Sequence, residues 1–418
     1  MVFPSAHVRR VWPALLLGLV VAIGLTACTV GQAGSATAGS VSAPDSGSAS
    51  GRTSAPASAS ASASASASAS ASAPAPGTMS DRSVPLSAAG DWTSADVQPG
   101  TAGIVSPAGD LVATPADGRI CFAPILAGEA TCVELAPADR PSFGLFSPDG
   151  AWLLVLAGPD EHSRAAYVIP VTGGVTHVIG PTGIDDLATT PPPHWDLATA
   201  AWTVDSSAVL LAPRTDQLDA ALLAADLGSK RIGEVGQLFG EMTNADLRIR
   251  ASAVGVAMSS DGPSSGQFLW WLGAGTKVLY RLARNESSGG SVYLVAADPR
   301  GQSVLSCPRA ADGTLGAITV TSVQSPQTVS AELLPDSKSC GGAAFSPDGS
   351  QLAVTAMLDG RSSLVVLNVA SGRRVLTAAL PGAEPAVPAS VTWWDDVVVV
   401  SDAGGDQVAP SSVIVRLR

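Results

Sequence analysis

Few side chains in this sequence have the types and spacing that acid–base chemistry requires. Asp160, Glu161 and His162 are consecutive, and a carboxylate beside an imidazole can exchange protons near neutral pH. Charged groups in a polar segment between apolar runs are usually solvated loop residues, so we expect these three to contribute to binding rather than catalysis. The four histidines are not grouped with cysteine. The sequence therefore predicts neither a metal site nor a cofactor.

A second polar segment, residues 180–198, separates two apolar runs. Its chemically capable residues are Asp185, Asp186, His194, Trp195 and Asp196. Connections of about 20 residues without secondary structure are uncommon and usually functional or disordered. Prolines 191–193 stiffen the segment, and a tryptophan beside histidine and aspartate is typical of binding hot spots. Two interpretations stay open: one recognition site shared with residues 160–162, or a packed loop in which Trp195 covers the neighbouring structure.

The sequence Gly262-Pro263-Ser264-Ser265-Gly266 matches the G-x-S-x-G pattern of a nucleophile elbow. That elbow requires a strand before the serine and a helix after it. Here the pattern lies among Ser, Gly and Pro residues, which favour a turn. The sequence therefore predicts no catalytic residue.

An internal repeat predicts the elements that position these residues. The sequence Phe146-Ser147-Pro148-Asp149-Gly150 recurs as Phe345-Ser346-Pro347-Asp348-Gly349. Degenerate copies begin near residues 105, 202, 297 and 393. The spacing is about 48 residues, except for one gap about twice as long, which predicts an eroded unit around residues 254–272. The chain is thus expected to hold seven units.

Each unit has the pattern of four antiparallel strands. In the clearest unit, strands are expected at residues 343–345, 351–356, 363–369 and 373–379. Alternating or β-branched runs indicate strands, and Pro-Asp-Gly has the residues of a tight turn. Paired tryptophans at 270–271 and 393–394 are expected in strands, where they pack on opposite faces. The sequence predicts an all-β fold, a β-propeller of seven four-stranded blades.

The repeated Phe-Ser-Pro-Asp-Gly motif resembles the WD40-like (PD40) repeats of TolB-type proteins, over roughly residues 100–418. TolB-type proteins also carry an α/β domain before the propeller, and the residues ahead of the first repeat are too few for it. We therefore do not transfer the role of TolB in the Tol-Pal system. The last unit supplies only three strands, ending at residues 412–417, so a segment within residues 83–97 is expected to pair beside them and close the ring.

The N-terminal segment has the features of an export signal. Positive residues at 7–10 precede an apolar run at 11–25, which is shorter than the about 20 residues of a membrane span. The run ends in Leu25-Thr26-Ala27-Cys28, which resembles the lipobox of bacterial lipoproteins. This resemblance implies that residues 1–27 are a signal peptide and that Cys28 is lipidated. The implied location is the outer side of a bacterial cytoplasmic membrane.

Residues 28–80 contain the lipidated cysteine and a segment rich in Ala, Ser, Gly, Pro and Thr, which cannot bury a core and is expected to be a disordered tether. Residues 81–418 form the expected propeller domain. The net charge of −12 makes nucleic acid an unexpected partner. We expect a monomer that contacts the membrane through its lipid.

Four cysteines remain once Cys28 carries lipid, and an even number outside the cytoplasm suggests disulfides. Cys121 and Cys132 flank a predicted hairpin turn, while Cys307 and Cys340 lie in neighbouring units. The sequence predicts these two pairs.

These features favour a binding or scaffolding module for an envelope protein or a cell-wall component. A fold does not define a function, so two alternatives remain. One is a propeller enzyme, such as a hydrolase, lyase or quinone-dependent dehydrogenase. The other is a sensory accessory lipoprotein of a membrane receptor or kinase.

Overall fold

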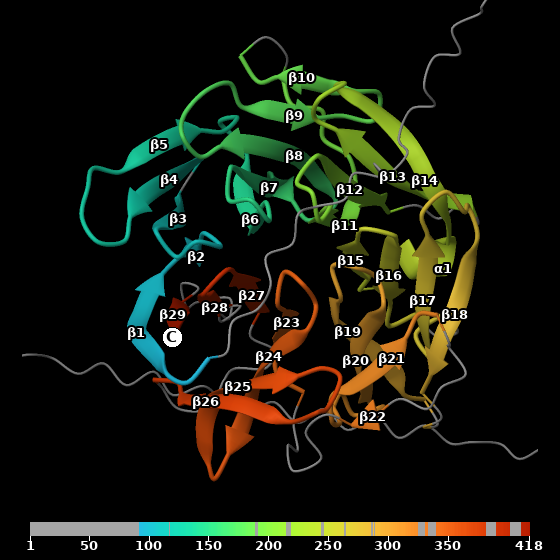
Figure 1. The fold of residues 1–418 in the computed structure, drawn as a ribbon. Helices are drawn as coiled ribbons and strands as arrows, with labels where there is room; N and C mark the ends of the chain where they lie inside the picture. The colour runs from blue at the N-terminus through green and yellow to red at the C-terminus, as the bar shows by residue number, and fades with distance from the viewer. Residues whose placement is uncertain are drawn as a thin grey trace, which may run out of the picture. The chain divides into compact units, whose positions relative to one another are not determined.

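The structure is a ring of antiparallel sheets with one short helix, α1 (Gly240–Thr243) (Figure 1). The computed structural model describes residues 92–116, 118–188, 191–214, 219–243, 246–262, 265–285, 287, 289–324, 331–332, 340–381, 390–401 and 411–418. The predicted signal peptide, Cys28 and the predicted tether lie outside these residues. In the part of the chain that is described, no helix is long and apolar enough to cross a membrane.

Seven sheets form the blades, numbered here along the chain. The strands of blades 1 and 2 are β2 (Ile104–Val105), β3 (Leu111–Ala116), β4 (Arg119–Pro124), β5 (Thr131–Glu134), then β6 (Arg140–Phe146), β7 (Trp152–Asp160), β8 (Ser163–Pro170), β9 (His177–Ile179) and β10 (Ile184–Asp186). The strands of blades 3 and 4 are β11 (Leu197–Trp202), β12 (Ala208–Pro213), β13 (Asp219–Asp226), β14 (Arg231–Phe239), then β15 (Arg248–Ser252), β16 (Gly255–Ser259), β17 (Phe268–Gly273) and β18 (Leu279–Arg284).

The remaining blades repeat the same order. The strands of blades 5 and 6 are β19 (Ser291–Ala297), β20 (Ser303–Arg309), β21 (Thr319–Ser322), β22 (Ala331–Glu332), then β23 (Ala343–Phe345), β24 (Gln351–Leu358), β25 (Arg361–Asn368) and β26 (Arg374–Ala379). Blade 7 contains β27 (Ser390–Trp394), β28 (Val397–Ser401), β29 (Ser411–Leu417) and β1 (Ala95–Ala102). The predicted all-β propeller of seven blades is therefore confirmed. The eroded unit is blade 4, at the position that the spacing indicated.

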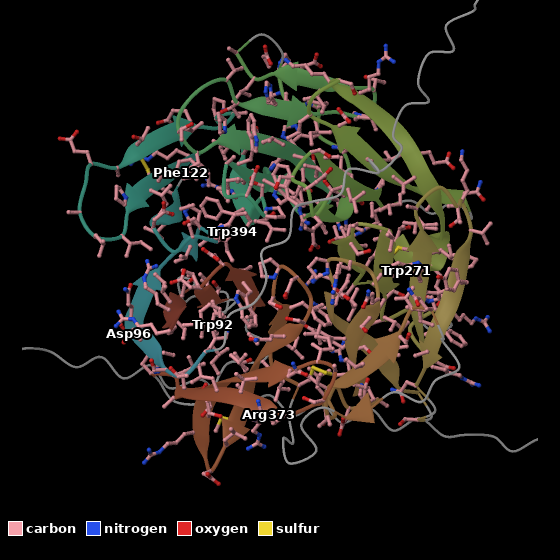
Figure 2. All side chains as sticks on the ribbon, viewed as in Figure 1. Trp92, Asp96, Phe122, Trp271, Arg373 and Trp394 are labelled. Atoms are coloured by element: carbon pink, nitrogen blue, oxygen red, sulfur yellow. A yellow bond between two sulfur atoms is a disulfide. The ribbon has the colours of Figure 1, made fainter. Side chains whose placement is uncertain are left out.

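The core lies between the blades. Middle strands such as β12 and β24 are buried on both faces, because a neighbouring blade packs on each side, and they are accordingly almost continuous runs of apolar residues. Trp270 packs in the cluster between blades 3 and 4, and Trp271 packs in the cluster between blades 4 and 5, as alternation along a strand predicts (Figure 2). Trp394 departs from that expectation, because 38% of it is exposed.

Blade 7 is completed by the N-terminal strand of the ring. β1 pairs antiparallel with β29, from Ala95 opposite Leu417 to Ala102 opposite Ser411. The predicted closure is confirmed, although the strand begins twelve residues after Ser83, where the expected range started, and continues past it to Ala102. Residues 83–91 lie outside the described part of the chain.

Blade 2 differs from the prediction of four strands per blade. Residues 184–186 form a fifth strand, β10, which pairs antiparallel with β9 at the outer edge of the sheet. The connection of residues 180–198 is therefore not a structureless loop. The short β9 leaves an edge of unpaired backbone groups, and β10 satisfies them.

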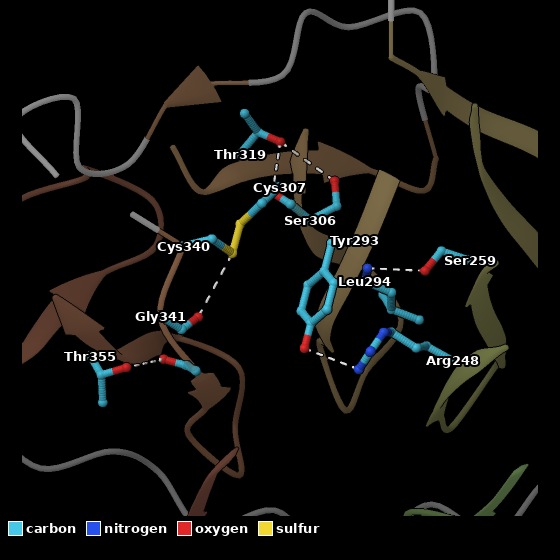
Figure 3. The surroundings of a disulfide bond; sticks show 11 residues. Arg248, Ser259, Tyr293, Leu294, Ser306, Cys307, Thr319, Cys340, Gly341 and Thr355 are labelled. Carbon is cyan, nitrogen blue, oxygen red and sulfur yellow. Dashed lines mark hydrogen bonds between the residues drawn. A yellow bond between two sulfur atoms is a disulfide. The ribbon is translucent and has the colours of Figure 1, made fainter. Parts of the chain in front are cut away.

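Both predicted disulfides are present. Cys121 and Cys132 face one another on the paired strands β4 and β5. Cys307 on β20 joins Cys340, which lies just before β23, so this bond links blade 5 to blade 6 (Figure 3).

Candidate functional site

The repeated blade order sorts the connections into two faces. In an antiparallel meander, successive connections alternate between the two ends of the strands. The lower face holds the Ser-Pro-Asp-Gly turns and their relatives, at residues 106–110, 147–151, 203–207, 298–302 and 346–350. The upper face holds the connections at residues 135–139, 161–162, 260–262, 265–267 and 310–318, together with residues 193–196, which lead into β11. Most of the residues singled out in the sequence lie on the upper face.

The two polar segments of the sequence meet on this face. The His162 Nδ1 atom lies 3.2 Å from Asp196 Oδ2 and 3.3 Å from Arg214 Nη1. A ring nitrogen either donates to the carboxylate or accepts from the guanidinium, so His162 can satisfy only one neighbour at a time. The Glu161 carboxylate lies 3.5 Å from His162 Nε2, and the Asp160 carboxylate accepts from the His162 backbone N–H. The expectation that these segments share one face is confirmed.

Backbone pairing fixes this arrangement. The N–H and C=O groups of Trp195 bond to the C=O and N–H groups of Arg164, at the start of β8. The N–H of Arg214, after β12, donates to the carbonyl oxygen of Asp196 at 2.7 Å. The segment that carries Asp196 is thus attached to blades 2 and 3 on both sides. Its position does not depend on the side chains that it presents.

His194 faces a different neighbour. Its Nε2 atom lies 2.7 Å from Asp139 Oδ1, on the connection between blades 1 and 2, and the Asp139 side chain has no solvent exposure. The Tyr167 hydroxyl donates to the other oxygen of Asp139. Burial and then the Asp139 carboxylate raise the pKa of Tyr167, so it stays protonated and keeps donating. The sequence analysis missed Asp139 and Tyr167, which anchor His194 to the ring.

Trp195 is half-buried and packs against the apolar cluster between blades 2 and 3. This placement corresponds to the second interpretation of the segment, in which Trp195 covers a blade. The indole Nε1 of Trp195 and the Nε of Arg164 are buried without a hydrogen-bond partner. Two polar atoms at this position remain to be satisfied by a group outside the chain or by water.

Asp185 and Asp186 lie apart from this site, on the outermost strand of blade 2. Asp186 accepts from Lys230 Nζ at 2.9 Å and lies 2.8 Å from His177 Nδ1. The hydrogen bond from Lys230, followed by the one from His177, lowers the pKa of Asp186. Asp185 is exposed on the same strand. The sequence alone could not separate these carboxylates from residues 194–196, because the separation depends on the pairing of β10.

The G-x-S-x-G sequence lies between β16 and β17, so a strand rather than a helix follows it. Ser265 bonds to Ser260 Oγ at 2.6 Å, and its N–H donates to Glu241 Oε1 at 2.7 Å. Pro263 and Ser264 lie outside the described residues. Among the residues that are described, no group of three or more His, Cys, Asp or Glu is arranged to hold a metal ion.

A depression of about 380 Å³ opens on the upper face between blades 4 and 5. Its lining includes Asp261, Gln267, Ser291, Arg309 and Asp312. Arg309 Nη1 lies 3.9 Å from Asp261 Oδ2, so the lining carries both signs of charge. The backbone N–H of Thr314 lowers the pKa of Asp312 and keeps that carboxylate charged. Gly262, the first residue of the G-x-S-x-G sequence, also lines this hollow.

Three solved structures are similar to this chain. TolB from Acinetobacter baumannii superposes with a TM-score of 0.42 and 14% identity, over 71% of this chain and 66% of that chain. An oligogalacturonate lyase in complex with manganese gives 0.50 and 13%, over 76% and 88%. A prolyl endopeptidase gives 0.48 and 15%, over 73% of this chain and 49% of that chain. At 13% identity, the likeness to the lyase shows the fold alone.

The similarity does not extend to an assigned family. No protein-family model matches the chain, and no curated protein matches it. The match spans less than two thirds of the TolB chain and about half of the endopeptidase. A shared fold does not define a function, so the function has to be argued from the residues of this chain.

Proposed function

We propose that this protein is a membrane-anchored, extracytoplasmic binding module that uses its upper face to hold an envelope protein or a cell-wall component. The observation that carries the proposal is the convergence of His162 with Asp196 and Arg214, three groups from two blades and the connection between them. The proposed contact surface consists of Glu161, His162, Asp196 and Arg214.

Exposure and rigidity support this surface. The side chains of Glu161 and His162 are 72% and 62% exposed, whereas that of Asp196 is 31% exposed and lies on a segment fixed by backbone hydrogen bonds. A surface that is ordered before binding loses less entropy when a partner docks. Because His162 has two competing neighbours, a partner that takes one of them leaves the other available to the imidazole.

The anchoring part of the proposal rests on the lipobox-like Leu25-Thr26-Ala27-Cys28. Thioether-linked and amide-linked acyl chains on Cys28 would hold the protein stably, since two chains suffice where one does not. Cys28→Ala should yield an unprocessed chain without label after growth in radiolabelled palmitate. A Cys28→Ala variant that still incorporates palmitate would contradict the anchor while leaving the upper face untested by that result.

The binding part is tested with a photo-crosslinking amino acid at residue 161 of the full chain, in cells. One crosslinked species should form, and it should be lost when His162→Ala and Arg214→Ala are introduced. Glu129→Ala is the matched control, because Glu129 is an exposed carboxylate in the turn between β4 and β5. Crosslinking that survives the double substitution, or that disappears equally with Glu129→Ala, would count against the upper face as the contact.

A further inference from the structure

The first strand of each blade lies nearest the axis of the ring (Figure 1), and several neighbouring first strands, such as β15 and β19, contact one another. These strands are β2, β6, β11, β15, β19, β23 and β27. Within their bounds they contain three arginines and no Asp or Glu: Arg140, Arg248 and Arg250. The whole chain has a net charge of −12. The axis therefore has the opposite charge character to the chain as a whole.

The Arg250 side chain, on β15, lies among the inner strands but is accessible to solvent, and two backbone carbonyls hold it in one position. Its Nε donates to the Val295 oxygen of β19 at 3.1 Å, and its Nη1 donates to the Ile249 oxygen at 2.9 Å. A guanidinium has five N–H donors. In the described part of the chain no carboxylate pairs with Arg250, so its other N–H groups are left for solvent or a ligand.

Arg248 lies on the same side of β15, because side chains two residues apart point the same way, while the intervening Ile249 is buried between the blades. The Arg248 guanidinium lies 4.1 Å from the centre of the Tyr293 ring and donates to the Tyr293 hydroxyl at 3.0 Å (Figure 3). It also donates to Asp246 Oδ2 at 2.6 Å. Asp246 therefore offsets the charge of Arg248 and leaves that of Arg250 uncompensated.

The electrostatics follow from this geometry. Enclosure by the surrounding strands, and then the positive charge of Arg248, lower the pKa of Arg250. Arginine remains charged at neutral pH nonetheless. A bound anion would compensate the guanidinium both for its lost hydration and for the repulsion by Arg248. The planar fork of a guanidinium matches two oxygens of a carboxylate or a phosphate, whereas chloride offers no such geometry.

We propose that Arg250, with Arg248 beside it, binds the oxyanion group of a small ligand, a phosphate or a carboxylate, at the inner strands of blades 4 and 5. This site is separate from the upper-face contact surface and does not depend on it. The two backbone carbonyls position the guanidinium of Arg250 before the ligand arrives, and the Tyr293 ring positions that of Arg248.

The test uses the full-length chain and calorimetric titration with two probes, inorganic phosphate and glucuronate, at an ionic strength held constant with sodium chloride. At least one probe should bind saturably, and glucose should not bind. Phosphate alone would indicate a phosphorylated ligand, and glucuronate alone a carboxylate ligand. Saturable binding of neither probe would overturn the proposal.

Arg250→Gln should weaken binding about tenfold or more, since a hydrogen bond to a charged group is lost together with the charge. Arg231→Gln is the matched control, because it removes the same charge from an exposed position on an outer strand, and binding should change less than about twofold. Equal affinities for Arg250→Gln and the wild type would refute the site.

A second measurement needs no substitution. Phenylglyoxal modifies accessible guanidinium groups, and peptide mapping reports each arginine separately. The bound probe should slow modification of Arg250 in the wild type and leave Arg231 unaffected. Equal rates at Arg250 with and without the saturating probe would show that the anion binds elsewhere.

Discussion

The lower and upper faces of the ring differ in where their polar residues find partners. On the lower face, the Ser and Asp side chains of each Ser-Pro-Asp-Gly turn bond within the turn: Ser147 donates to Asp149 at 2.6 Å and accepts from the Trp152 N–H at 2.9 Å. A backbone group also reaches the next blade, because the Asp149 N–H donates to Ser206 Oγ at 3.1 Å. Ser346 makes the same bonds with Asp348 and Gln351, at 2.7 and 3.0 Å. On the upper face, polar groups instead connect separate segments, as His162 does with Asp196 and His194 with Asp139.

This difference distinguishes residues that maintain the fold from residues that could bind a partner. A residue that recurs in several blades satisfies a requirement that every blade has, such as closing the turn after its first strand. A polar residue without a counterpart in the other blades answers a requirement at one place only. In a repeat protein, the departures from the repeat are therefore the residues to test for binding.

The largest expected effect comes from the upper face. Asp139→Ala removes the acceptor of the buried Tyr167 hydroxyl and of His194, and we expect the free energy of unfolding to fall by about 3 kcal/mol. Denaturant unfolding measures this change. Asp185→Ala, at an exposed carboxylate, is the control and should cost less than about 0.5 kcal/mol. Equal losses would mean that the buried carboxylate does not anchor this face.

Two glycines with positive φ, one on each face, sharpen the comparison. Gly349 has φ +67°, and a methyl group there would overlap the Asp298 carboxylate of the neighbouring blade. Gly360, in the turn between β24 and β25, has φ +74° and open space around it. We expect Gly349→Ala to lower the free energy of unfolding by about 2 kcal/mol or more, and Gly360→Ala by about 1 kcal/mol. A larger loss for Gly360→Ala than for Gly349→Ala would contradict the greater steric demand of the lower-face turn.

The serines of the lower turns should contribute equally to the free energy of unfolding. Ser147→Ala and Ser346→Ala each remove one hydroxyl that both donates and accepts, so each should cost about 1 kcal/mol in thermal or denaturant unfolding. The two losses should agree within about 0.5 kcal/mol. Strongly unequal losses would show that the repeated turns do not share one structural role.

The smallest expected effect on stability is at His162. Because its side chain is 62% exposed and its ion pairs lie at the surface, His162→Ala should change the free energy of unfolding by less than about 0.5 kcal/mol. Circular dichroism during chemical unfolding is a sufficient measurement. A loss above about 2 kcal/mol would place His162 among the structural residues and remove the contrast with Asp139.

The fold could be predicted from the sequence because the lower turns repeat. Six recognisable copies set the spacing, the gap located blade 4, and the missing fourth strand of the last unit required closure by an N-terminal segment. Strand β10 could not be predicted, because residues 184–186 are short and polar and become a strand only by pairing with β9. The exposure of Trp394 likewise depends on its place on an inner strand.

The candidate site was predictable only in part. The meander placed residues 160–162 and 194–196 on one face, but it could not show that His194 and Asp196 face different partners. Asp139 and Tyr167 are 28 residues apart with no motif between them, so their hydrogen bond is visible only in three dimensions. Arg250 did leave a signal: Arg248 and Arg250 alternate along the first strand of a blade, where apolar residues otherwise predominate.

The pairing of β1 with β29 has a consequence for the order of events during biosynthesis. Ala95 is made early and must wait for its partner Leu417, which is made more than 300 residues later. Blades 1 to 6 can pair their strands as they emerge, but the ring closes only when β29 has been made. Any copy that stops before residue 411 lacks β29 and leaves β1 unpaired, so a cell could distinguish finished molecules from unfinished ones by that exposed strand edge.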